Sequence, residues 1–319
     1  MTFTAFLMTA SGLALLFVGG ELLLRGAVAI ALRSGLSPML IGLTIVAFAT
    51  SMPELLVTVT AGLEGVTDVG VGNVVGSNIA NILLILGTAA IIRPLATQPG
   101  LVMRDALAMI AATAVFIAFA MLGEIGPLHG MAMLVLLVAY VWTGYRWEKR
   151  NGRTQAVEAE VLEEAGKAPS SMGKSLLLLT AGLAALCFGS NLLVDGAVSI
   201  ARAAGVSEAV IGLTLVAFGT SLPELATAIV AGIRNHTDVT LGNVIGSNIF
   251  NILLIIGVLA IITPFKVPAE VMSFDIWVMA AVSIAIIPVM LTNRRIGRIE
   301  GIVFFALYIA FIVYQFEHG

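Results

Sequence analysis

The sequence predicts an all-α membrane protein with ten transmembrane helices, arranged as two inverted five-helix repeats. Three observations support this fold class: an apolar composition, an internal duplication, and an odd number of apolar segments in each copy. Of the 319 residues, 59% are hydrophobic and 11% are charged, and the mean hydropathy is +1.07. A typical soluble domain has about 25% charged residues. Nearly the whole chain is therefore expected to lie in a lipid bilayer.

The internal duplication has an offset of 170 residues. Residues 37–94 align without gaps on residues 207–264, and about 35 of the 58 aligned positions are identical, well above the weak similarity usual for repeats in membrane proteins. Two polar motifs recur in both copies. The first reads AFATSMPE at 47–54 and AFGTSLPE at 217–224, and the second reads GNVVGSNIAN at 72–81 and GNVIGSNIFN at 242–251.

Ten apolar segments are predicted in chain order. They cover residues 3–32, 38–63, 70–92, 104–123, 128–146, 174–203, 208–233, 240–263, 271–291 and 299–316. The first is too long for a cleaved signal peptide, lacks a basic start and matches the sixth at the same offset. Five segments per copy is an odd number, so the second copy must insert upside down. We expect the first repeat at 1–146, a short cytoplasmic linker at 147–173 and the second repeat at 174–319.

The distribution of Lys and Arg predicts the orientation in the membrane. With the N-terminus outside, thirteen basic residues fall on the cytoplasmic side, and only Arg202 and Lys266 fall outside. Both termini are therefore expected outside. The cytoplasmic residues are Arg33, Arg93, Arg104, Arg146, Lys149, Arg150, Arg153, Lys167, Lys174, Arg234, Arg294, Arg295 and Arg298.

Two glutamates at bilayer depth are the leading candidates for a functional site. Glu54 is the one charged residue between positions 40 and 61, and Glu224 occupies the equivalent place in the second copy. A carboxylate at this depth is costly, so we interpret both residues as functional. Structural pairing of the two acids would require a shared proton and is the less favoured interpretation.

Further oxygen atoms are expected on the same helix faces as the glutamates. Thr50 and Ser51 precede Glu54 by four and three residues, a spacing that places them on one face of a helix. Pro53 has no amide hydrogen and frees the carbonyl group four residues before it. The second motif adds a serine and an asparagine four residues apart. A single Ser or Thr in a membrane helix often bonds only to its own backbone, but this combination offers the all-oxygen ligands that hard cations require.

These duplicated motifs resemble those of the calcium/cation antiporter superfamily, which includes the sodium/calcium exchangers, over nearly the whole chain. The first copy departs from the pattern in having Ala49 in place of glycine. The resemblance implies a prokaryotic inner-membrane antiporter that exchanges Ca²⁺ for Na⁺ by alternating access at a midplane site, with the first and sixth helices sliding across the rest. No cofactor is expected. The implied cation ligands are Glu54, Glu224, Thr50, Ser51, Thr220, Ser221, Ser77, Asn81, Ser247 and Asn251, with the carbonyl groups of Ala47 and Ala217.

Asn251 leaves the coupling ion open. Some microbial sodium/calcium exchangers have an aspartate at this position, whereas this chain has asparagines at both 81 and 251. The site would then contain two acids rather than three. Ca²⁺/H⁺ exchange and a K⁺-dependent variant remain the alternatives to Na⁺ coupling.

Other classes of function are less consistent with the sequence. A cation channel usually forms its pore from rings of charges or carbonyl groups in an oligomer. An intramembrane enzyme would need a nucleophile or a metal motif, and His129, His236 and His318 lie at expected loops or the terminus. The chain has no basic tract for nucleic acid, and nothing in it implies an obligate protein partner. The linker is too short for the calcium-sensing domains of animal exchangers.

Two charged residues, Glu21 and Arg25, lie within the first apolar segment. Arg25 is four residues after Glu21, and Asp195 occupies the position equivalent to Arg25 in the second copy. We interpret Arg25 as one half of a structural ion pair, either with Glu21 on the same helix or with Asp195 on the sixth. A role in switching between open states is the alternative interpretation.

Overall fold

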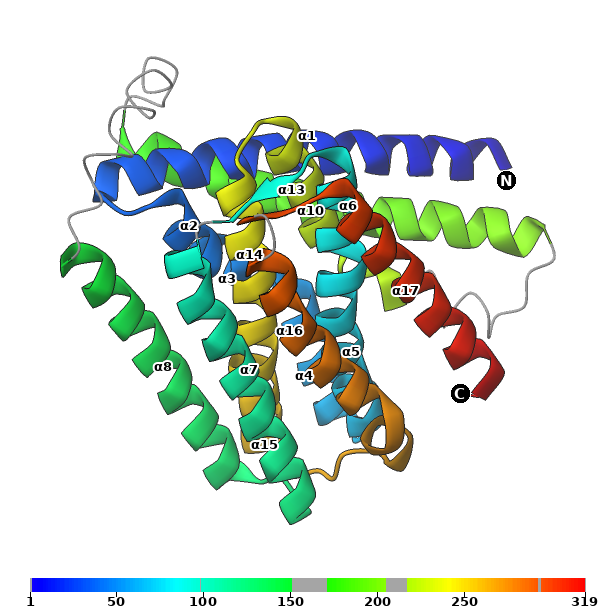
Figure 1. The fold of residues 1–319 in the computed structure, drawn as a ribbon. Coiled ribbons are helices and arrows are strands. Elements are labelled where there is room, and N and C mark those ends of the chain that lie inside the picture. Colours follow the sequence, from blue (N-terminus) through cyan, green and yellow to red (C-terminus); the bar gives the residue numbers. More distant parts are fainter. Residues whose placement is uncertain (1, 98, 151–170, 205–216, 292–293, 319) are drawn as a thin grey trace.

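The computed structural model describes residues 2–97, 99–150, 171–204, 217–291 and 294–318. Within these ranges the chain is almost entirely helical (Figure 1), with one two-stranded pairing and one isolated bridge between the helices. Eight of the described helices are long and apolar enough to cross a membrane, and a bent pair of helices forms a ninth candidate span. The chain is therefore a helical membrane protein, as the sequence predicts.

Five helices are continuous and follow the expected segments closely. They are α1 (Thr2–Ser34), α7 (Pro99–Leu122), α8 (Pro127–Arg150), α10 (Met172–Ala203) and α17 (Arg298–His318). The last turn of α8 and the first turn of α10 extend into the range expected to be linker. Residues 151–170 of that range lie outside the described residues.

The other segments are composite, because short helices and π-helical turns follow one another. They are α2 (Pro38–Ile41), η1 (Gly42–Val46), α3 (Ala47–Thr50) and α4 (Met52–Leu63); α5 (Thr67–Ala80), η2 (Asn81–Leu86) and α6 (Gly87–Ile92); α12 (Ala217–Gly219) and α13 (Leu222–Ile233); α14 (Thr237–Phe250), η4 (Asn251–Ile256) and α15 (Gly257–Ile262); and η5 (Val271–Asp275) and α16 (Ile276–Leu291). Of the seventh expected segment, residues 208–216 lie outside the described residues. The π-helical turns η2 and η4 occupy equivalent positions, and such turns are frequent at functional sites.

The connections between helices pair in equivalent places. β1 (Leu95–Ala96) is antiparallel to β2 (Arg295–Ile296), with Leu95 opposite Ile296. An isolated antiparallel bridge joins Ile125 to Phe265, and these two residues are 170 positions from Arg295 and Leu95 respectively. The two halves of the chain therefore contact each other through matching connections.

The composite helices at 67–92 and 237–262 form the centre of the molecule. In each of these two segments, 78% of the most apolar 18-residue stretch is buried, whereas the value for α17 is 11%. The largest apolar cluster joins these helices to α7 and α16, with Val75, Ile85, Phe116, Ile249 and Met279 among its fully buried members. Residues at the beginnings of η2 and η4 are therefore shielded on all sides.

Helices α1 and α10 lie side by side and run across the remaining helices (Figure 1). Glycines at every seventh position of each helix form the contact: 12, 19 and 26 on α1, and 182, 189 and 196 on α10. A Cβ atom at Gly182 would lie 2.3 Å from the Leu23 nitrogen and 2.8 Å from the Gly19 oxygen. Small residues allow such close backbone contact between membrane helices, so α1 and α10 form a tightly packed pair.

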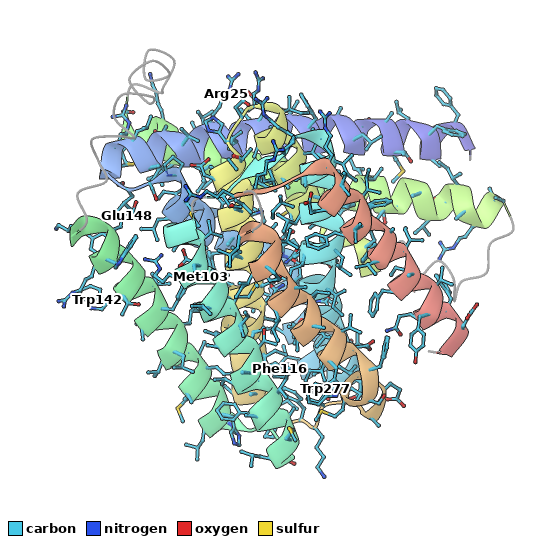
Figure 2. All side chains as sticks on the ribbon, in the orientation of Figure 1. Arg25, Met103, Phe116, Trp142, Glu148 and Trp277 are labelled. Carbon is cyan, nitrogen blue, oxygen red and sulfur yellow. The ribbon has the colours of Figure 1, made fainter. Side chains whose placement is uncertain are left out.

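Arg25 of α1 pairs with Glu21 on the same helix, which is the first of the two pairings that the sequence suggests. Arg25 Nε lies 2.7 Å from Glu21 Oε1, as expected for a pair on one helix, but the Arg25 side chain is 61% exposed. Figure 2 shows Arg25 on the outer surface of α1. The second partner of Glu21 is Arg234, at 2.8 Å. Arg234 directly follows α13, so the pair connects α1 to that helix. Asp195, the alternative partner of Arg25 that the sequence suggests, is exposed.

Candidate cation site

Two helix breaks bring the candidate site residues to the interior. Ser51 (φ −81°, ψ 6°) separates α3 from α4, where the chain bends by 44°. Ser221 (φ −88°, ψ 5°) separates α12 from α13. A proline follows each break at the second position of the next helix, where its missing amide hydrogen costs nothing. Glu54 and Glu224 then lie in the first helical turn, where the helix dipole favours negative charge.

The two glutamates are bound crosswise by serines of the opposite copy. Ser51 Oγ donates to Glu224 Oε1 at 3.3 Å, and Ser221 Oγ donates to Glu54 Oε1 at 3.2 Å. Each glutamate is only 1% exposed. Glu54 and Glu224 therefore lie close together in the interior, as the duplication predicts.

Several buried oxygens of the candidate residues have no hydrogen-bond donor among the described residues. They are Glu54 Oε2, Glu224 Oε2, Asn81 Oδ1, Asn251 Oδ1 and Ser247 Oγ. Buried polar atoms nearly always have a partner, so unpartnered ones call for an explanation. A cation would provide that explanation, because carboxylate, amide and hydroxyl oxygens are the ligands that Ca²⁺ uses.

Two asparagines that sequence reasoning missed, Asn73 and Asn243, form hydrogen bonds with candidate site residues. Thr50 Oγ1 donates to Asn243 Oδ1 at 3.2 Å, and Thr220 Oγ1 donates to Asn73 Oδ1 at 3.4 Å. The Asn73 amide also donates to the Glu54 carbonyl oxygen at 3.4 Å. Asn73 and Asn243 each precede the motif serine by four residues, a spacing that was sufficient to place them on the same helix face.

The predicted site residues within the described ranges lie in or beside this interior. Glu54, Glu224, Thr50, Ser51, Ser221, Ser77, Asn81, Ser247 and Asn251 are all at most 5% exposed, and Thr220 is half-buried. Ser77 contacts Ser221 at 3.5 Å. The Ala47 carbonyl already accepts from the Ser51 nitrogen at 3.0 Å. In the second copy the Ser221 nitrogen donates to the Phe218 carbonyl oxygen at 3.2 Å.

The charges of the site are consistent with a hard cation. Among the described residues, ion pairs join Glu21 with Arg25 and Arg234, and Asp105 with Arg104. No basic side chain of the described part forms such a pair with Glu54 or Glu224. The described part of the chain contains no cluster of three His, Cys, Asp or Glu side chains. Two carboxylates among neutral oxygens suit Ca²⁺ or Na⁺ better than a transition metal, which prefers nitrogen or sulfur ligands.

Comparison with known proteins places these features in a family. A family model described as sodium/calcium exchanger protein matches residues 4–146 and 174–317. The sodium/calcium exchanger MaX1 of Methanosarcina acetivorans is 33% identical, over 98% of this chain and 98% of that protein. The inner membrane protein YrbG of Escherichia coli is 34% identical, over 86% of this chain and 84% of that protein.

The fold agrees with a solved structure as well. The sodium–calcium exchanger NCX_Mj, soaked with 2.5 mM Na⁺ and 0.1 mM Ca²⁺, has 34% sequence identity and a TM-score of 0.82, over 98% of this chain and 99% of that one. Sodium and calcium are also the ions that the sequence motifs imply. The family model, the relatives and the fold all agree, and this membrane protein therefore belongs to the sodium/calcium exchanger family.

Proposed function

We propose that this chain is a secondary antiporter that exchanges Ca²⁺ for Na⁺ by alternating access at a site centred on Glu54 and Glu224. The observation that carries the proposal is the pair of buried carboxylates, each with an Oε2 atom that lacks a donor among the described residues. Two carboxylates balance the charge of one Ca²⁺ or of two Na⁺. Because the same oxygens serve either ion, binding of one excludes the other, and the site reorients loaded with one or the other.

The proposed ligands are the ten polar side chains named from the sequence, together with the carbonyl groups of Ala47 and Ala217. Six to eight oxygens are needed for Ca²⁺, and the two glutamates alone supply four. The unpartnered oxygens of Ser247, Asn81 and Asn251 support the remainder of the set. Asn73 and Asn243 help to hold two of these ligands in place, because they accept hydrogen bonds from Thr220 and Thr50.

The proposed architecture has ten spans in two inverted repeats, at 1–146 and 174–319, joined by a cytoplasmic linker. The matching connections at 95/296 and 125/265 support a two-fold relation between the repeats. The basic residues support outward termini, and the name of the relative YrbG supports the inner membrane of a prokaryote. Neither an enzymatic activity nor an obligate protein partner is part of the proposal.

Alternating access requires a part that moves, and α1 and α10 are proposed as that part. Their backbones are in direct contact at six glycines, so the two helices would slide as one unit. The ion pair from Glu21 to Arg234 joins this unit to α13. Exposed ion pairs contribute only about 0–1 kcal/mol, so this connection would not prevent the movement.

The experiment is uptake of ⁴⁵Ca²⁺ into proteoliposomes under imposed ion gradients. An outward Na⁺ gradient should drive uptake, whereas a pH gradient of equal size should not, in the presence or absence of K⁺. Uptake driven by the pH gradient alone would establish the Ca²⁺/H⁺ alternative, and a requirement for K⁺ would establish the K⁺-dependent variant. Absence of Ca²⁺ uptake under every gradient would overturn the proposal.

A further inference from the structure

Two buried asparagines beside the site, Asn78 and Asn248, occupy equivalent positions in the two copies. Both follow the motif serine directly and are at most 1% exposed. Asn248 Nδ2 lies 3.4 Å from the Asn78 carbonyl oxygen, so the two residues meet where α14 crosses α5. Neither side chain belongs to the proposed ligand set.

Asn248 forms a direct hydrogen bond with Asn81, one of the proposed ligands. Its Oδ1 accepts from Asn81 Nδ2 at 2.9 Å, and its Nδ2 lies 3.4 Å from the sulfur of Met109. The Asn81 amide nitrogen is thereby turned toward Asn248, and Asn81 Oδ1 is left without a donor among the described residues. An amide free to rotate could present its N–H groups to a cation, whereas this contact presents the oxygen.

Asn78 does not make the equivalent contacts. Its Nδ2 donates to the Val74 carbonyl of its own helix at 2.8 Å. Within the described ranges, Asn78 Oδ1 and Asn251 Oδ1 are both buried without a donor. The crosswise contacts between serines and glutamates, by contrast, are nearly identical in the two copies, at 3.3 and 3.2 Å. The contacts of the two asparagine pairs therefore differ between the copies, although the contacts of the glutamates match.

We propose that Asn248 is a positioning residue that orients Asn81 toward the cation in one access state, and that Asn78 orients Asn251 in the opposite state. This inference rests on the proposed alternating-access function and deepens it. When two inverted repeats exchange conformations, a contact made by one copy is made by the other. The groups needed for the exchange are present: Asn78 Oδ1 is an acceptor without a donor, and Met279 lies buried at the position equivalent to Met109.

The two asparagines provide a matched pair of variants, Asn248→Leu and Asn78→Leu. Leucine is close in shape to asparagine but forms no hydrogen bonds through its side chain, and the two substitutions are made at equivalent positions of the two copies. The apparent affinity for Ca²⁺ is measured by Na⁺-driven ⁴⁵Ca²⁺ flux in right-side-out and in inverted membrane vesicles, so that each membrane face is examined separately. Asn248→Leu should weaken the affinity about fivefold on one face only, the effect of losing one buried amide hydrogen bond. Asn78→Leu should weaken it by a similar factor on the opposite face.

Other results would overturn the inference. A purely structural role predicts that each variant changes the affinity equally on both faces, or that neither variant changes it. A loss on the same face for both variants would equally contradict the alternation. If a leucine variant does not fold, Asn248→Ala and Asn78→Ala provide the same comparison. Failure of the wild-type protein to exchange cations at all would instead reject the proposed function, so the two failures are distinguishable.

Discussion

Replacement of Gly182 by alanine tests how tightly α1 and α10 are joined. The new Cβ atom would lie 2.3 Å from the Leu23 nitrogen and 2.8 Å from the Gly19 oxygen. Both atoms belong to the backbone of α1 and cannot rotate away. Non-bonded heavy atoms prefer a separation of about 3.5 Å, so the two helices must move apart by roughly 1 Å. Overpacking of this kind costs about 1–3 kcal/mol.

A glycine elsewhere in the chain provides the control for this substitution. Alanine in place of glycine raises helix propensity by about 1 kcal/mol, and this gain applies to any helical site. Gly232, in α13, has no atom within 4 Å of an added Cβ. Gly182→Ala and Gly232→Ala should therefore differ in the free energy of unfolding by the overpacking cost alone.

Thermal denaturation of the purified protein in detergent, with and without Ca²⁺, measures this difference. Gly182→Ala should melt several degrees below Gly232→Ala, since about 1 kcal/mol shifts the Tm of a chain of this size by roughly 2 °C or more. Initial rates of Ca²⁺ uptake should fall in the same variant, because a separated pair of helices no longer slides as one unit. If Gly182→Ala melts at or above the control and transports at the wild-type rate, the close glycine contact does not hold the pair together.

Three further predictions follow from the site and from the distribution of charge. Glu54→Gln and Glu224→Gln should each abolish Ca²⁺ exchange in proteoliposomes without unfolding the protein. One carboxylate about 4 Å from a divalent ion contributes roughly 8 kcal/mol of attraction at an effective dielectric constant of 20. Appreciable exchange by either variant would contradict the proposed site. Asn251→Asp should make Ca²⁺ flux fall more steeply as the pH is lowered and should alter its response to membrane potential, because a third carboxylate binds a proton or an additional cation. A pH profile and voltage response identical to those of wild type would show that position 251 is only structural. A cysteine introduced at Asn151 in a Cys187→Ala background should resist impermeant thiol reagents applied to intact cells, and its labelling from outside would refute the orientation.

The duplication and its polar motifs were sufficient to predict the class of fold and the pair of glutamates. Both predictions depend on local chemistry: a carboxylate and a proline in an apolar segment have few structural explanations. The ends of most helices also follow from hydropathy alone, because apolar length determines a span. Ten spans and their inverted relation remain predictions, since part of the seventh segment lies outside the described residues.

Contacts that depend on tertiary packing could not be predicted in the same way. Sequence spacing placed Glu21 next to Arg25, but the approach of Arg234 depends on how α1 lies over the end of α13. Asn73 and Asn243 have the correct spacing to join the site, yet an asparagine in a membrane helix serves equally well to bridge helices. Only the hydrogen bonds with Thr220 and Thr50 distinguish the two roles.

The crosswise contacts between serines and glutamates also bear on how the two copies have evolved. Ser51 bonds to Glu224, and Ser221 bonds to Glu54, so neither copy contains a complete set of partners for its own carboxylate. A substitution in one copy immediately alters the chemistry of the other, and the two halves of the gene cannot diverge independently at these positions. This mutual dependence gives a physical reason why the motifs around 47–54 and 217–224 have remained so similar after the duplication. It also means that a single half could form such a site only by associating with a second half.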